Sequence, residues 1–161
     1  MLKAKTATAC EITRMDPKRL NEIASLGIYT CLPETRPGAS RIFDRNDLIA
    51  LRCYVIMRGE GIPEAVCGKV ACTVRGFLGI DGMEVFQKIE WVRIHFVPEE
   101  YQEIRQREFF VSMNSYDAIR PDLVDGIIMG ESTDMPVSLF FNIKALRDDI
   151  TRQLESRTNI V

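Results

Sequence analysis

Residues 18–22, KRLNE, place a lysine, an arginine, an asparagine and a glutamate within five positions. Lys18 and Arg19 suit the acceptor atoms of guanine or a phosphate group, and Asn21 suits adenine. Glu22 can accept a hydrogen bond from the amino group of cytosine, although a solvated helix residue is the alternative reading. An acid on such a surface opposes nonspecific binding to a polyanion. The mixture therefore indicates selective contact with base edges.

Other kinds of chemistry have little support in the sequence. The chain has one histidine, His95, which alternates with Arg93 along a strand-like segment and is interpreted as a partly buried or surface residue. We find no Gly-rich phosphate loop, nucleophile elbow or His-x-x-x-His pattern. We therefore expect no enzyme, no cofactor and no metal site. A small-molecule effector pocket in the second half stays open, with nothing to specify its ligand.

The five cysteines lie at positions 10, 31, 53, 67 and 72, without a Cys-x-x-Cys pair. We expect reduced, mostly buried thiols in a reducing compartment, with a metal or redox site as the alternative. Apolar runs are interrupted before the length that a membrane span needs, and the N-terminal residues do not resemble a secretory signal. These features predict a cytoplasmic protein with no membrane partner.

The formal net charge of −2 conceals an asymmetry between the two halves. Residues 1–78 contain twelve Lys/Arg and eight Asp/Glu, a net charge of +4, and residues 79–161 contain nine and fifteen, a net charge of −6. A basic half in an acidic chain suggests that the basic half meets a polyanion.

Helical spacing governs the first half. A short helix over about 6–12 is followed by a turn and then by Asp16 and Pro17, an N-cap and a first helical proline. This second helix extends to about Ser25, before Gly27 at a position typical of helix ends. Two short helices joined by such a turn predict a helix-turn-helix.

Residues 28–43 have β-forming ends around a Pro/Gly-rich tip that carries Arg36, which predicts a β-hairpin, or wing. Asp44 then caps a third helix, with Asp47 in its first turn. This helix is apolar on nearly every side, so it must be covered on more than one side. A fourth, amphipathic helix begins at Pro63.

The second half has strand-like periodicity and ends in an amphipathic helix from Asn142 to about Arg157. The predicted strands are 89–97, 109–114, 123–130 and 135–141, with a helix at 98–108 after the first. The fold class is therefore α+β, an N-terminal winged helix-turn-helix followed by a small antiparallel-sheet domain with a C-terminal helix. The expected domains are 1–78, for DNA binding, and 79–161, for dimerisation or an effector.

Residues 9–77 resemble the MerR-type winged helix-turn-helix. The segment ACEITRMDPKRLNEIASLGI carries Leu20 and Gly27 at the expected places, and MRGEGIPEA matches the link before the fourth helix. The segment RIFDRNDLIAL matches the end of the wing at Arg41, Phe43, Asp47 and Leu48. Five elements agree in order and spacing.

Two departures limit what this resemblance implies. Glu22 and Ile23 stand where the family usually has aromatic residues, and GIDG with β-rich sequence follows where many members have a long dimerisation helix. Neither the effector machinery of the metal- and drug-sensing members nor their activation by DNA distortion is therefore expected to transfer.

In a helix-turn-helix the outer face of the second helix enters the major groove. With Leu20 inward, helical geometry places Ile23 and Ala24 beside it and the polar residues outside. The turn residues suit phosphate contact, and Arg36 suits a flanking groove or the backbone. Arg41 contacts the backbone or, alternatively, braces the wing against the first helix. The predicted DNA-binding residues are Thr13, Arg14, Lys18, Arg19, Asn21, Glu22, Ser25, Arg36 and Arg41.

These observations predict a sequence-specific transcription regulator of bacterial or phage type that binds double-stranded DNA. Repression is favoured because the dimer coiled coil of the activators is lacking, and a homodimer is expected because a single helix-turn-helix contacts little DNA. One alternative is an architectural DNA binder, such as an excisionase-like recombination factor or a small terminase subunit. Another is a protein-binding adaptor.

Overall fold

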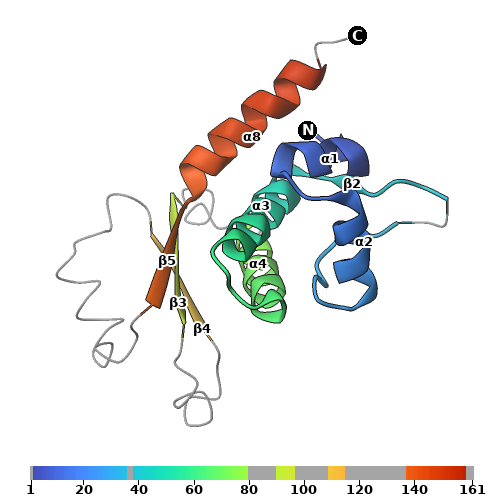
Figure 1. Cartoon of the computed structure of the whole chain (residues 1–161). Coiled ribbons are helices and arrows are strands. Elements are labelled where there is room, and N and C mark those ends of the chain that lie inside the picture. Colours follow the sequence, from blue (N-terminus) through green and yellow to red (C-terminus); the bar gives the residue numbers. More distant parts are fainter. Residues whose placement is uncertain (1, 36–37, 80–89, 97–108, 115–136, 159–161) are drawn as a thin grey trace. The chain divides into compact units, whose positions relative to one another are not determined.

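The computed structural model describes residues 2–35, 38–79, 90–96, 109–114 and 137–158, and only the backbone of 110–114, 137–138 and 158. Helices and two small antiparallel sheets make up this part of the chain, as expected for an α+β protein (Figure 1). The chain forms two compact units, one of Met1–Gly82 with Ala145–Val161 and the other of Met83–Lys144.

The first two helices are α1 (Thr6–Thr13) and α2 (Pro17–Ser25), joined by residues 14–16. The predicted start of α2 is confirmed, since the Asp16 side chain accepts a hydrogen bond from the backbone N–H of Arg19 at 2.9 Å. The predicted end is confirmed as well. Gly27 has a φ of 68°, and the N–H of Ile28 donates to the carbonyl of Ile23 at 2.9 Å.

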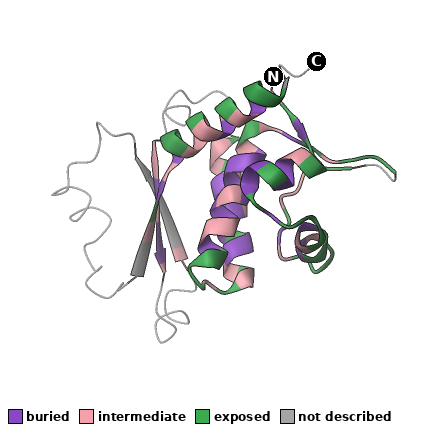
Figure 2. Cartoon of the chain, turned by 45° about the horizontal axis from the view of Figure 1, so that its top comes forward, coloured by how far each residue is buried: buried purple, intermediate pink, exposed green. Residues whose placement is uncertain are grey.

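Helix α3 (Arg45–Gly59) is the centre of the first unit. Asp44 and Asp47 form a reciprocal capping box at its start, each side chain accepting from the other residue's backbone N–H at 2.8 Å. Helix α3 packs on α1 and on α4 (Glu64–Leu78), and Figure 2 shows buried residues along its length. The prediction that it is covered on more than one side is confirmed by its buried residues, Asp47, Leu48, Ile49, Ala50, Leu51, Cys53, Tyr54 and Met57.

The segment after α2 lies directly against α4. A Cβ atom added to Gly68 would lie 1.9 Å from the carbonyl oxygen of Ile28, so only glycine permits this approach. One helical turn further along α4, Cys72 meets Cys31. Residues 28–31 are therefore held against one face of α4.

The predicted β-hairpin across 28–43 is wrong. Strand β2 (Ile42–Phe43) pairs antiparallel with β1 (Ala4–Lys5) near the N-terminus, and residues 28–35 contain no strand. The reason lies in the backbone groups at 28 and 29. The N–H groups of Ile28 and Tyr29 both donate to the carbonyl of Ile23, which commits them to ending α2. They are therefore not available for a strand ladder.

The second unit contains a three-stranded antiparallel sheet with the order β4-β3-β5. Its strands are β3 (Trp91–Phe96), β4 (Phe109–Asn114) and β5 (Val137–Asn142). They confirm three of the four predicted strands. The predicted strand at 123–130 and the predicted helix at 98–108 lie outside the described residues. Val92, Ile94 and Phe141 are buried, while the guanidinium of Arg93 lies 4.7 Å from the ring centre of the exposed Phe140.

Helix α8 (Ile143–Thr158) matches the predicted C-terminal helix, and Ile150 and Leu154 of its apolar stripe are buried. From Ala145 onward it groups with the N-terminal unit, whereas the sequence assigns it to the second domain. An ion pair between Arg157 and Glu11 of α1 accompanies this grouping. An amphipathic stripe shows that a helix is covered on one side, but it does not show by which part of the chain.

Two glycines of α4 provide a test of this packing. Gly68→Ala should lower the free energy of unfolding by about 2 kcal/mol or more, because the new methyl group collides with the backbone of Ile28. The control is Gly76→Ala, where nothing lies within 4 Å, and which should stabilise by about 0.5–1 kcal/mol through helix propensity. Urea denaturation measures both. A Gly68→Ala variant as stable as Gly76→Ala would contradict the close approach.

Candidate nucleic-acid interface

Helix α2 has one sealed face and one open face. Leu20 and Ile23 have no exposed surface and anchor the helix to the core. The polar side chains on the outside, Lys18, Asn21, Glu22 and Ser25, are exposed. The division predicted from helical spacing is thus present, with Ala24 half-buried between the two faces. We call Lys18, Asn21, Glu22 and Ser25 the outer face of α2.

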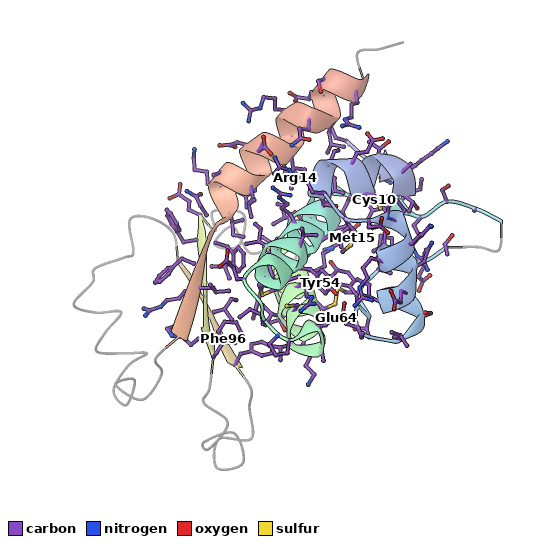
Figure 3. All side chains as sticks on the ribbon, in the orientation of Figure 1. Cys10, Arg14, Met15, Tyr54, Glu64 and Phe96 are labelled. Atoms are coloured by element: carbon purple, nitrogen blue, oxygen red, sulfur yellow. A yellow bond between two sulfur atoms is a disulfide. The ribbon has the colours of Figure 1, made fainter. Side chains whose placement is uncertain are left out.

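The turn before α2 presents a cation at its surface. Arg14 is exposed and has a φ of 59°, the left-handed conformation that ends α1, and Figure 3 labels it. Met15, the next residue, is buried, and its N–H donates to the carbonyl of Cys10 at 2.9 Å. Because Met15 anchors the turn, the backbone that carries Arg14 is held in place.

A second arginine, Arg52, binds the backbone directly before this turn. Nη1 of Arg52, on α3, donates to the carbonyl of Thr13 at 3.0 Å and so satisfies a free carbonyl at the end of α1. Burial lowers the pKa of Arg52, and the positive charge of Arg14 lowers it further. Two guanidinium groups therefore act on each other near the turn. Sequence reasoning did not assign Arg52 to the site, although it is the only charge between Leu48 and Met57.

Thr13 is a correction to the predicted set. Its side chain is fully buried, and its hydroxyl donates to the carbonyl of Ala9 at 2.7 Å within α1. A hydroxyl bonded back to its own helix and sealed from solvent cannot reach a phosphate group. Thr13 contributes to this region through its carbonyl, which accepts from Arg52.

Arg19 is exposed for 38% of its side chain and is held by two acids. It forms ion pairs with Glu22 on its own helix and with Glu64 at the start of α4. Glu64 also accepts a hydrogen bond from the hydroxyl of Tyr54 at 2.7 Å, and Figure 3 labels this pair. The hydrogen bond from Tyr54 is the main cause that lowers the pKa of Glu64, and Arg19 adds to it. Arg19 thus links α2 to α4, a role that its sequence position does not reveal.

The other predicted residues are less closely placed. Ser25 is exposed, and its hydroxyl donates to the carbonyl of Glu22 at 2.8 Å. Arg41 is half-buried directly before β2. Arg36 lies outside the described residues. Thr35 and Ala39 flank this segment, and the hydroxyl of Thr35 donates to the carbonyl of Ala39 at 2.8 Å.

An ion-pair cluster lies shortly after Arg41 in the sequence, at the start of α3. Arg75 of α4 binds Asp44 through Nη2 at 3.0 Å and Asp47 through Nε at 2.5 Å. Burial raises the pKa of Asp47, and the hydrogen bond from Arg75 opposes that effect. The two acids that cap α3 therefore also attach its start to the last turn of α4.

The cysteines differ from the expectation of five reduced thiols. Cys31 and Cys72 form a disulfide, with Cα atoms 5.4 Å apart. Cys31 and Cys72 are 41 positions apart in the sequence, and they meet because residues 28–31 lie along α4. The spacing of the cysteines in the sequence does not indicate this contact. Cys10, Cys53 and Cys67 are free and buried, as expected. Burial raises the pKa of Cys53 to about 12 and that of Cys67 to about 11.

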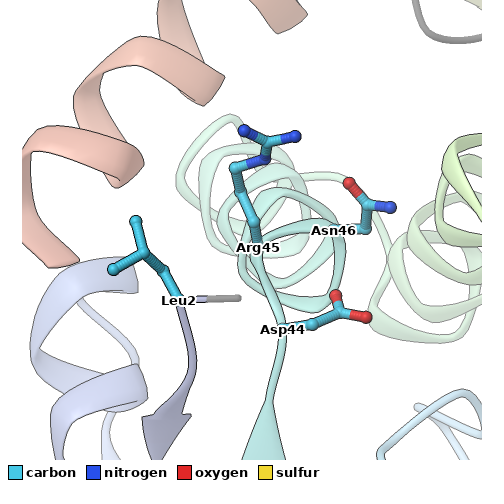
Figure 4. A pocket seen from close by; sticks show the side chains of 4 residues that line it. All are labelled: Leu2, Asp44, Arg45 and Asn46. Carbon is cyan, nitrogen blue, oxygen red and sulfur yellow. The ribbon is translucent and has the colours of Figure 1, made fainter. Parts of the chain in front are cut away.

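Two surface hollows lie near the start of α3. Figure 4 shows the smaller, about 200 Å³, lined by Leu2, Asp44, Arg45 and Asn46. Asn46 is committed to structure, since its amide donates to the carbonyl of Leu78 at 2.8 Å. The larger, about 440 Å³, is lined by Lys3, Cys31, Leu32, Pro33, Ile42, Asp44, Asp47 and Arg75. Cys31, the cysteine among the residues that line the larger hollow, is held in the disulfide with Cys72.

The described ranges contain no candidate metal site and no candidate membrane span. They contain no group of three or more His, Cys, Asp and Glu side chains that could hold a metal ion. His95 is buried on β3, and burial lowers its pKa, with Arg93 adding to the effect. None of the helices described combines the length and the apolar character needed to cross a bilayer.

The Tyr54–Glu64 hydrogen bond can be tested by substitution. Tyr54→Phe should raise the pKa of Glu64 and cost about 1 kcal/mol of stability at neutral pH. A lowered carboxyl pKa stabilises the folded state above the unfolded pKa, and this contribution is lost as the pH falls through the folded pKa. The stability gap between the two proteins should therefore narrow in acid.

Carboxyl titration by NMR and denaturation at pH 7 and pH 3 measure these effects. Tyr29→Phe is the control. Tyr29 packs edge-on against Tyr54, with 5.7 Å between the ring centres, but the hydrogen bond to Glu64 comes from the hydroxyl of Tyr54. An unchanged Glu64 titration in Tyr54→Phe would contradict the assignment.

No protein-family model matches this chain, and no curated protein matches it. The resemblance of residues 9–77 to the MerR-type module therefore stays a prediction made from residues and spacing.

Proposed function

We propose that the first unit is a helix-turn-helix module that binds double-stranded DNA and that the protein is a sequence-specific transcription regulator. The observation that carries the proposal is the two-sided character of α2. Its inner face is sealed by Leu20 and Ile23, while its outer face exposes Lys18, Asn21, Glu22 and Ser25. An exposed helix of this kind fits the major groove, where these side-chain types can bind base edges.

The electrostatics of the turn support the same orientation. Arg14 is exposed at the end of α1, and Arg52 lies close enough for the two charges to interact. In a helix-turn-helix the turn lies beside the DNA backbone while the N-terminal part of the second helix meets the bases. Arg14 is therefore proposed to bind a phosphate, and Lys18 and Asn21 to bind bases.

Arg19 has a different proposed role. Its ion pairs with Glu22 and Glu64 compete with any contact to DNA. We assign it to orienting α2 on α4, with Glu64 and Tyr54 as its support. Glu22 is then partly neutralised by Arg19, which lowers the repulsion that an acid would otherwise exert on a DNA phosphate.

The loop between α2 and β2 is proposed to take the place of a wing. Figure 1 shows its described arms extending away from the helices. Both arms are attached at their bases, one by the Cys31–Cys72 disulfide and the other by the Arg75–Asp44 ion pair. Arg36 and Arg41 of this loop stay candidates for contact with the DNA backbone.

Binding as a homodimer is part of the proposal, because one short recognition helix contacts too little DNA for tight binding. The second unit and the surface of α8 are where we expect the dimer contact. Repression by occupying an operator is favoured over activation, for the reason that the sequence provides no long dimerisation helix after α4.

Lys18→Ala tests the outer face of α2. After a duplex has been selected from a random library, this variant should lose about 1–3 kcal/mol of binding free energy on the selected sequence and relax selectivity at one position. Lys69→Ala on α4 is the matched control, since it removes the same charge from an exposed helical site. Equal losses for both variants on selected and scrambled duplexes would refute the assignment.

Arg14→Ala tests the turn. The variant should weaken binding to selected and scrambled duplexes alike and reduce the slope of log K against log salt by about one unit, as expected when one phosphate contact is lost. Fluorescence anisotropy across a salt series measures the slope. A change in sequence preference with an unchanged slope would place Arg14 at a base and contradict the docking proposed here.

Binding selections also separate this function from its rivals. A single palindromic site supports a dimeric regulator, while clustered direct repeats with DNA bending favour an architectural DNA binder. Absence of DNA binding at low salt would overturn the proposal and favour a protein-binding adaptor.

A further inference from the structure

The Cys31–Cys72 disulfide lies where the proposed recognition helix passes into the proposed wing. Cys31 follows α2 by six residues and begins the loop, and Cys72 belongs to α4. The bond is therefore a covalent tether between the base of the loop and the helical core.

This pair differs from the other cysteines in its access to solvent. Cys31 and Cys72 are half-buried, and Cys31 lines the larger hollow near the start of α3. Cys10, Cys53 and Cys67 are buried, and burial raises the pKa of each. Buried thiols of that kind are inert, whereas a half-buried pair can be reached by a small thiol or disulfide.

We propose that Cys31 and Cys72 are a redox-operated tether that holds the base of the loop at Cys31 on α4 when oxidised and releases it when reduced, and so regulates DNA binding. The regulatory part rests on the proposed function, while the tether itself does not. The oxidant is a low-molecular-weight disulfide such as glutathione disulfide. One cysteine thiolate attacks it, expels one glutathione thiolate and forms a mixed disulfide.

The second cysteine thiolate then attacks the protein sulfur of that mixed disulfide and expels the second glutathione thiolate. The two cysteines lose two electrons and two protons, and two molecules of glutathione gain them. The backbone N–H of Cys31 donates to Sγ of Cys72 at 3.2 Å, and the hydroxyl of Thr30 approaches the same sulfur at 3.9 Å. Thr30 precedes the released segment, so its hydroxyl stays beside Sγ of Cys72 after reduction, and we expect Cys72 to be the attacking sulfur.

Reduction should release the loop without releasing α2. The end of α2 has its own attachments, because the N–H groups of Ile28 and Tyr29 donate to the carbonyl of Ile23 at 2.9 and 3.2 Å. Tyr29 is buried against Tyr54, and Ile28 lies against Gly68. The chain therefore gains freedom after residue 30. We expect a change in the affinity that the loop contributes and no change in the sequence preference that α2 provides.

The test uses the full chain in three forms: wild type equilibrated with glutathione disulfide, wild type reduced with a phosphine, and the Cys31→Ser, Cys72→Ser double variant. Thiol counting after denaturation should find three thiols in the first form and five in the second, since the chain has five cysteines. The thermal midpoint should fall by about 10 °C on reduction. A glutamate-specific protease should cleave after the exposed Glu34 faster in the reduced wild type and in the double variant than in the oxidised wild type.

Binding to the selected duplex should weaken about tenfold on reduction, with the ratio of the affinities for the selected and scrambled duplexes unchanged. The double variant should bind the selected duplex with the same affinity in oxidising and reducing buffer. Cys31→Ser, which keeps Cys72, should form a mixed disulfide with glutathione faster than Cys72→Ser. Five thiols after oxidation, or cleavage at Glu34 that is insensitive to reduction, would overturn the tether. The same affinity for DNA in both redox states would overturn the regulation. Absence of DNA binding in both states would overturn the proposed function, and the thiol count would still test the tether.

Discussion

The burial of α3 is the constraint on which the first unit depends. Eight of its residues are buried, although a helix standing at a surface needs only one apolar stripe. An exposed α3 would leave apolar surface in water on several sides, so α1 and α4 must pack around it, and α2 follows α1 through a turn of three residues. The position of the proposed recognition helix is thus a consequence of covering α3.

Polar contacts then determine details that apolar packing leaves undetermined. Arginines are held at three junctions between helices: Arg19 by Glu64, Arg75 by Asp44 and Asp47, and Arg52 by the backbone carbonyl of Thr13. Each pair or bond joins segments distant in sequence. Partly exposed ion pairs contribute little to stability, but their geometry limits how far one helix can slide along another. A rigid α2 can place its side chains in a groove with less loss of entropy on binding.

Helix α2 and the loop between α2 and β2 are attached to the core by different contacts. The apolar inner face of α2 and the bonds that end the helix do not depend on the oxidation state of the cysteines. The base of the loop does, because the disulfide is its attachment to α4. In the proposed DNA-binding module, in which α2 binds bases and the loop binds the DNA backbone, that division allows affinity to vary while the recognised sequence stays the same.

The sequence alone determined the elements whose signals are local. An Asp–Pro start, a glycine in the left-handed conformation and a capping box act through hydrogen bonds within four residues, so the bounds of α2 and α3 could be predicted closely. The outer face of α2 could be predicted for the same reason, since helical periodicity needs no knowledge of the rest of the chain.

Only the tertiary structure decided the contacts between distant segments. It gave β2 its partner near the N-terminus instead of a hairpin, joined Cys31 to Cys72, assigned α8 to the first unit and bound Arg19 to Glu64. It also sealed Thr13, which had looked available for a phosphate. Each of these outcomes depends on which surfaces compete for the same backbone groups and the same space, and residue types and spacing carry no record of that competition.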